Sequence, residues 1–287
     1  EGRELGTLNP NGLPYVDKVW KLPGPDLLLS GGGKPPDVGD IEINKKIIIR
    51  TLESFNVNGV EVADVQVGPT VTKYALSPPA GVRINAVSNL QHDIARALSS
   101  PTGEIRVEAP IPGTSLIGLE VPNRTRAIVD FKSLIYSEPM KSEKSKLMVV
   151  LGTDVGGVTH AYDIGEMPHL LVAGQTGSGK SVFLHNLIMS IVYRATPQEV
   201  KFIIVDPKRV ELISYEDIPH LYTPVIIEKD RAVSVFGWAV SEMAKRFKMF
   251  QSARVSNIKA YNEKSGFQAL PYVVIIVDEF TEIMMQD

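Results

Sequence analysis

The sequence predicts an α/β protein in which a domain with a parallel sheet is preceded by a small α+β domain. Two observations predict the parallel sheet. After residue 168, apolar strand-like runs alternate with segments of helical periodicity, which is the pattern of βαβ units. In addition, residues 272–277 are apolar throughout, as expected of a strand that is covered on both faces.

The first part of the chain is predicted to hold an arm and the small domain. Residues 1–26 are rich in proline and glycine, a composition that disfavours regular helix and is typical of an extended arm or linker. Residues 27–104 show helical spacing and strand-like runs in turn, which predicts a compact α+β domain. The expected helices are 41–55 and 87–98, and the expected strands are 61–67, 70–76 and 104–108.

Residues 105–287 are predicted to form the domain with the parallel sheet. The expected strands are 115–120, 126–130, 147–151, 169–173, 201–206, 224–227 and 272–278, and the expected helices are 180–194 and 231–250. The second helix carries an apolar stripe at helical spacing, which predicts contact with the core. The stripe consists of Phe236, Ala239, Val240, Met243, Phe247 and Phe250.

Composition limits the classes of function. The chain has 30 basic and 33 acidic residues and a net charge of −3, so no overall basic field indicates static coating of nucleic acid, although local basic loops could still grip it. The absence of cysteine excludes disulfides and thiolate metal sites. Apolar runs fall far short of the ~20 residues that span a bilayer, so we expect no membrane contact by this chain. The start at Glu1, without methionine, indicates a piece of a longer protein.

A glycine-rich segment, residues 174–181, lies between the expected strand 169–173 and the expected helix 180–194. It matches the phosphate-loop pattern G-x-x-x-x-G-K-[S/T] at every required position. Glycines let successive backbone N–H groups point at phosphate oxygens, and the N-terminus of the following helix favours the same anion. The pattern predicts ATP binding by Gly174, Gln175, Thr176, Gly177, Ser178, Gly179, Lys180, Ser181 and Val182.

Four residues have predicted roles in the chemistry of this site. Lys180 would reach the β- and γ-phosphates, and the hydroxyl of Ser181 would ligate Mg²⁺. At the end of the expected strand 272–278, Asp278 would hold Mg²⁺ through its water shell, and Glu279 would orient or deprotonate the attacking water. Lys180 and Glu279 are therefore the predicted catalytic residues, and ATP and Mg²⁺ the predicted cofactors, of a P-loop ATPase.

Two simpler interpretations stay open at this stage. The strand 272–278 could end in two acids that are only solvated. Asp206-Pro207-Lys208, at the end of another expected strand, could position the nucleotide or couple subunits, or could simply stop the strand and leave the lysine in solvent.

Several further segments together resemble the motor region of the FtsK/SpoIIIE family of double-stranded DNA translocases. The similar segments are 68–72, 109–113, 120–123, 167–174, 206–208, 218–221 and 278–280, and the likeness covers about residues 27–287. It implies a family alpha domain over about 27–104 and an incomplete RecA-like P-loop domain, called beta, over about 105–287. It also implies a hexameric ring that pumps duplex DNA with ATP.

The resemblance implies a cytoplasmic motor region whose parent protein is anchored in the bacterial inner membrane at the division septum. The alternative function is an FtsK-like ATPase that powers protein secretion or conjugative transfer, and a third is a structural protein that only binds nucleotide. The family continues beyond Asp287 with further strands and DNA-facing loops, so no DNA-contact residue or trans-acting arginine is assigned. A sheet without those strands would expose an apolar edge, so we expect weak hydrolysis by this chain alone.

Overall fold

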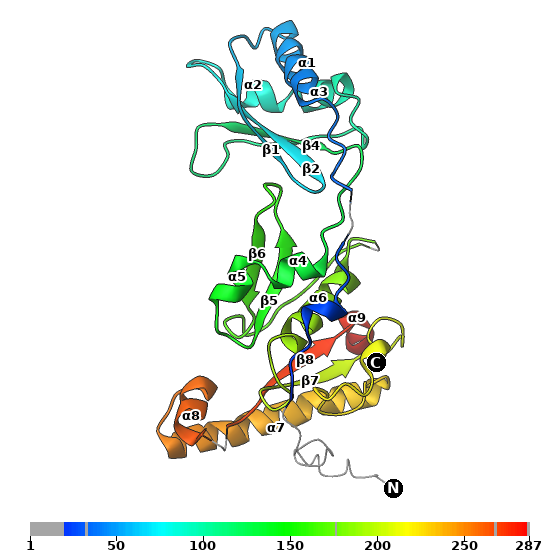
Figure 1. The fold of residues 1–287 in the computed structure, drawn as a ribbon, viewed down its shortest axis with the longest axis vertical. Helices are drawn as coiled ribbons and strands as arrows, with labels where there is room; N and C mark the ends of the chain where they lie inside the picture. The colour runs from blue at the N-terminus through cyan, green and yellow to red at the C-terminus, as the bar shows by residue number, and fades with distance from the viewer. Residues whose placement is uncertain (1–19, 32–33, 176, 267–268, 286–287) are drawn as a thin grey trace. The chain divides into compact units, whose positions relative to one another are not determined.

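A computed structural model describes residues 20–31, 34–175, 177–266 and 269–285 (Figure 1). The chain divides into two compact units. The first holds residues 28–143 and 150–162, and the second holds residues up to 27, 144–149 and 163–287. Among the described helices, none has both the length and the apolar character that crossing a membrane requires. The mixed α/β class predicted from the sequence is confirmed.

The first unit is built on an antiparallel sheet with the strand order β1-β2-β4-β3. Its strands are β1 (Glu61–Val67), β2 (Val71–Ser77), β3 (Arg106–Glu108) and β4 (Ile117–Pro122). Helices α1 (Ile41–Ser54) and α3 (Gln91–Ala97) cover one face of this sheet (Figure 1). Tyr74 and Leu76 of β2 are fully buried against Ile48 and Leu52 of α1 and Ile94 of α3.

Local sequence explains where the first helix of this unit begins. The side chain of Asp40 accepts hydrogen bonds from the backbone N–H groups of Glu42 and Ile43, at 2.9 and 3.0 Å, and so caps α1. The expected helix 87–98 is instead two helices, α2 (Ile84–Ser88) and α3. They are separated at Leu90, whose ψ of 8° interrupts the helical backbone.

The first unit extends further along the chain than the small domain expected from the sequence. Strand β4 pairs with β2 along its whole length, and the unit continues to residue 143. Helices α4 (Phe131–Ile135) and α5 (Glu138–Ser142) follow. The paired strands β5 (Met148–Thr153) and β6 (Thr159–Asp163) come next, and residues 150–162 of them belong to this unit. A domain boundary after residue 104 stays a prediction.

The expected strand 126–130 was wrong: Ala127 donates a single backbone hydrogen bond, to Pro69, and Ile128 is exposed.

The second unit has a parallel pair of strands at its centre. Strand β7 (Val200–Val205) pairs with β8 (Tyr272–Val277) in register, from Val200 opposite Tyr272 to Val205 opposite Val277. The other elements of this unit are α6 (Lys180–Val192), α7 (Lys229–Ala253), α8 (Ile258–Ser265), α9 (Phe280–Met284) and the short 3-10 helices η1 (Pro25–Leu27) and η2 (Ile213–Tyr215). The predicted parallel arrangement is therefore confirmed for these two strands.

Successive residues of β7 face opposite sides of this pair of strands. Phe202 and Ile204 pack with Ile188 and other residues of α6, whereas Ile203 and Val205 pack with the first turns of α7 and with α9. Helices α6 and α7 thus lie on the two sides of the strands (Figure 1). This explains why residues 202–205 of β7 are all apolar and buried, because a strand segment covered on both faces has no solvent side.

Two of the strands expected in this unit are not regular strands. Residues 169–173 have no regular secondary structure, and Leu170 and Leu171 are 45% and 84% exposed. Their apolar pattern is that of a strand, but among the described residues no strand pairs with them. The expected strand 224–227 is reduced to one parallel bridge, between Ile226 and Val205.

The prediction that an apolar stripe on helix 231–250 contacts the core is confirmed for Phe236, which packs on a core cluster, and is wrong for the exposed Val240, Met243 and Phe247. Ala232 and Val235, in the first turns of α7, are buried, but Val240, Met243 and Phe247 are more than half exposed. In the second half of the helix, Met243 and Phe247 line an open groove with Tyr272 of β8 and so stay exposed. Helical periodicity indicates an apolar face, but only a neighbouring element can bury it.

Candidate nucleotide-binding site

The phosphate loop ends at the N-terminus of α6. Gly177 and Gly179 have φ angles of 80° and 99°, a region that side chains with a Cβ disfavour. Gly179 is the residue before the helix, and among the described residues no side chain is seen to cap the N–H groups of its first turn. The loop therefore presents unpaired donors and the positive end of the helix dipole, which suits a phosphate group.

The predicted ligands of the nucleotide lie along this loop and the first turn of the helix. Gly174, Gln175 and Ser178 are exposed, and the backbone N–H of Ser178 donates to the carbonyl of Gln175 at 3.0 Å. Ser181 lies in the first turn of α6, and Val182 after it is 62% exposed. Thr176 lies outside the described residues. Binding roles for all of these residues remain predictions.

The structure brings the phosphate loop and the acidic pair together. The ammonium nitrogen of Lys180 lies 3.0 Å from Oδ1 of Asp278 and 3.8 Å from Oε2 of Glu279. Asp278 is only 4% exposed, and its hydrogen bond and charge raise the pKa of Lys180. The two acids are therefore not merely solvated residues at a strand end, because Lys180 of the phosphate loop forms ion pairs with both.

Strand register accounts for the position of the acids. The backbone N–H of Asp278 donates to the carbonyl of Val205 at 3.0 Å, one residue beyond the last aligned pair of β7 and β8. Asp206 and Asp278 consequently follow neighbouring parallel strands at the same edge, where ligands bind in open α/β sheets. Glu279 then takes a left-handed backbone conformation, with φ 51° and ψ 55°. Such conformations in residues other than glycine concentrate at functional sites.

Lys208 is a residue of this site to which the sequence assigned no definite role. Its ammonium nitrogen lies 2.9 Å from Oε2 of Glu279 and 3.4 Å from Oε1 of Glu282. The hydrogen bond from Lys208 is the main cause that lowers the pKa of Glu279, and the same bond raises the pKa of Lys208. In the sequence, the position of Lys208 just after a strand indicated a possible role at the site. The sequence does not show, however, which strands end next to one another.

The residues present fit a magnesium ion that is held partly by phosphate and water. No cluster of three or more potential protein ligands occurs in the described parts of the chain. Magnesium usually takes only one or two protein oxygens and fills its other positions with waters and substrate phosphates, so Ser181 and Asp278 suffice. Nearby, the fully buried Oδ1 of Asp206 has no hydrogen-bond partner among the described residues, so it could accept from a water of the ion.

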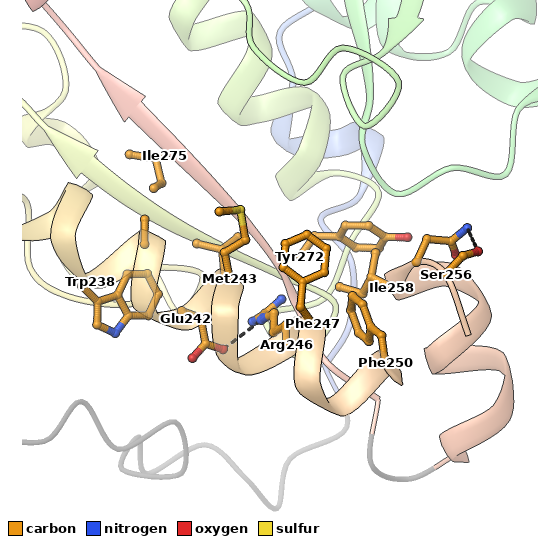
Figure 2. Close-up of a pocket in the computed structure, with 13 residues that line it drawn as sticks. Trp238, Glu242, Met243, Arg246, Phe247, Phe250, Ser256, Ile258, Tyr272 and Ile275 are labelled. Atoms are coloured by element: carbon orange, nitrogen blue, oxygen red, sulfur yellow. Dashed lines mark hydrogen bonds and ion pairs between the residues drawn. The ribbon is translucent and has the colours of Figure 1, made fainter. Parts of the chain in front are cut away.

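A separate groove lies between α7, the start of α8 and strand β8 (Figure 2). It has a volume of about 450 Å³ and is lined largely by apolar side chains, including Trp238, Met243, Phe247 and Tyr272. Among its lining residues, Arg246 pairs with Glu242 at 2.8 Å. The groove follows the first residues of β8, whereas the acids lie beyond its last residue, so it is not part of the phosphate site.

Comparison with known proteins places both units in one family. The model of the FtsK/SpoIIIE family matches residues 131–287, and the model of the FtsK alpha domain matches residues 22–123. The DNA translocase FtsK of Clostridium acetobutylicum is 43% identical over 256 residues, which are 88% of this chain and 33% of that protein. The DNA translocase SftA of Bacillus subtilis is 42% identical over 253 residues, which are 87% of this chain and 26% of that protein.

Among solved structures, the monomer of the pCW3 conjugation coupling protein TcpA with ATPgS is similar at a TM-score of 0.47 and 22% identity, over 84% of this chain and 66% of that one. A likeness this low has no bearing on function. The chain spans about a quarter to a third of the length of the two translocases. The family model covers more than half of the chain, including the phosphate loop and the acidic pair, and the chain therefore belongs to the FtsK/SpoIIIE family.

Proposed function

We propose that this chain is the nucleotide-binding part of a motor that hydrolyses ATP and translocates double-stranded DNA. The observation that carries the proposal is the contact of Lys180 with both Asp278 and Glu279, since it joins a phosphate-binding cation to a magnesium-type acid and a water-orienting acid. The names of the related translocases support DNA as the substrate. A homohexameric ring, a membrane anchor elsewhere in the protein and a role in chromosome segregation at division belong to the same proposal.

Each residue of the site has a defined task in this mechanism. The N–H groups of the phosphate loop and the first turn of α6 bind phosphate oxygens, and Lys180 moves from Asp278 to the β- and γ-phosphates. Asp278 and Ser181 would then hold Mg²⁺, and the ion would supply positive charge that neutralises the phosphates. Glu279 orients the attacking water and accepts its proton.

The alternative of an FtsK-like ATPase for protein secretion or conjugative transfer is less well supported. From the sequence, such proteins are expected to share the phosphate loop but to lack the small domain that contains residues 68–72. Residues 22–123 of this chain match the FtsK alpha domain, which favours the DNA motor.

The test is ATP hydrolysis by the full-length protein that contains this chain, with and without duplex DNA, and with Lys180→Ala as the control. We expect duplex DNA to stimulate hydrolysis strongly and the control to abolish it. Hydrolysis that does not respond to DNA would contradict the DNA motor and favour the secretion-type ATPase.

A further inference from the structure

The loop after strand β7 has a defined conformation built around a buried carboxylate. Asp206 is fully buried, and its backbone N–H donates to the carbonyl of Ile226 at 2.8 Å. Its Oδ2 accepts from the backbone N–H of Leu212 at 2.9 Å, and its carbonyl accepts from the N–H of Arg209 at 3.2 Å. These bonds fix the backbone on either side of Lys208, so the position of this lysine follows from the fold.

The side chain of Lys208 is held between two acids. It contacts Glu279 at 2.9 Å and Glu282, one helical turn later in α9, at 3.4 Å. Lys180 approaches the same oxygen of Glu279, Oε2, at 3.8 Å. Two ammonium groups, one from the start of α6 and one from the loop after β7, therefore share one carboxylate oxygen, and the closer of the two is Lys208.

Glu279 depends on a partner to hold its carboxylate in one place. It has the left-handed backbone described above and precedes α9, a helix of only five residues. About a third of its side chain is exposed. Within the described part of the chain, the one hydrogen bond that its carboxylate accepts comes from Lys208. When phosphates draw Lys180 away, Lys208 is the cation that remains on Glu279.

We propose that Lys208 is a positioning residue for ATP hydrolysis, which anchors the carboxylate of Glu279 toward the phosphate site by bridging it to Glu282. This inference rests on the proposed function. Lys208 acts on Glu279 and not on the nucleotide, so its loss affects turnover and leaves nucleotide binding intact. Misplacement of a reacting group by about 1 Å can cost about 100-fold in rate.

The experiment uses the full-length protein and compares Lys208→Ala with Lys229→Ala. Lys229 is a matched control, because it also contacts Glu282, at 3.9 Å, and has the same 47% side-chain exposure, but its contact does not include Glu279. We expect Lys208→Ala to lower kcat by about 10- to 100-fold, with KM and the Kd for ATP within about 3-fold of wild type. Lys229→Ala should stay within about 2-fold in kcat, and Lys208→Arg should recover part of the lost rate because a guanidinium can bridge two carboxylates.

A second measurement separates positioning from a structural role. In a Glu279→Gln background, adding Lys208→Ala should lower the residual rate by no more than about 2-fold, since a residue that acts through Glu279 has little left to position. An unchanged or raised kcat in Lys208→Ala, or a raised Kd for ATP with kcat unchanged, would overturn the inference. A wild-type protein without ATP hydrolysis would overturn the proposed function as well, whereas an active wild type with an unaffected Lys208→Ala variant would overturn only the inference.

Discussion

The ammonium nitrogen of Lys180 lies 3.0 Å from Oδ1 of Asp278, and this ion pair joins the phosphate loop to the end of strand β8. Asp278 is almost completely buried, whereas the side chain of Lys180 is 29% exposed. A buried carboxylate that loses its cation keeps the cost of its desolvation. The pair is therefore expected to matter for stability as well as for nucleotide binding.

Lys180→Ala should destabilise the nucleotide-free chain by about 1–3 kcal/mol, because it leaves the charge of Asp278 buried without its partner. Urea unfolding followed by circular dichroism measures this. Adding Asp278→Asn should recover part of the loss, since the buried charge is then removed. A double variant that is less stable by the sum of the two single losses would show that the residues do not interact.

Glu279→Gln should retain ATP binding and lower turnover by roughly 10²- to 10⁴-fold, because an amide cannot accept the proton of the attacking water. Binding is measured with a fluorescent ATP analogue, and turnover by phosphate release in the full-length protein. Glu282→Gln, one helical turn away, should lower turnover far less, because it leaves the 2.9 Å contact of Lys208 with Glu279 in place. Wild-type turnover in Glu279→Gln would exclude Glu279 as the general base.

Stability should fall between pH 7.5 and pH 5.5 because of His220. Burial is the main cause that lowers the pKa of His220 below its usual 6.5, although the carbonyl of Ala195, 2.9 Å from Nε2, opposes the shift. The unfolded chain then binds a proton near pH 6.5 while the folded chain does not, so the stabilising contribution is present above about pH 6.5 and is lost as the pH falls toward the lower folded pKa.

Urea midpoints at the two pH values test this prediction. The decrease should be smaller in His220→Gln than in wild type, whereas the exposed His92→Gln control should keep the wild-type decrease. Equal decreases in wild type and in His220→Gln would contradict the role of His220.

Two phenylalanines of the second unit should respond very differently to truncation. Phe202 of β7 is fully buried, whereas Phe247 in the groove beside α7 is 59% exposed. We expect Phe202→Ala to cost about 3–5 kcal/mol of unfolding free energy, and Phe247→Ala to cost less than about 1 kcal/mol. Chemical denaturation of both variants measures the difference. Similar large losses would mean that the groove is filled in solution.

Several features of the protein were predictable from the sequence because they depend on neighbouring residues only. The phosphate loop is one, since its glycines and Lys180 lie within one short segment that determines its own backbone conformation. Helix α1 is another, because Asp40 caps it locally. The contact of β8 with apolar residues on both of its faces also agrees with the sequence, because an apolar run with no polar alternation has no solvent face, although only Ile276 of this strand is buried.

Other features were decided only by the tertiary structure, because they depend on which segments become neighbours. Residues 169–173 carry the pattern of a strand, but a strand forms only where a partner satisfies its backbone, and the described residues offer none. The stripe of α7 is apolar, but in its second half it lines an open groove beside β8, so Met243 and Phe247 stay exposed. The contact of Lys208 with Glu279 exists because the register of β7 and β8 places the two strand ends side by side. Sequence determined the local chemistry of the site, and the parallel register determined which charges meet there.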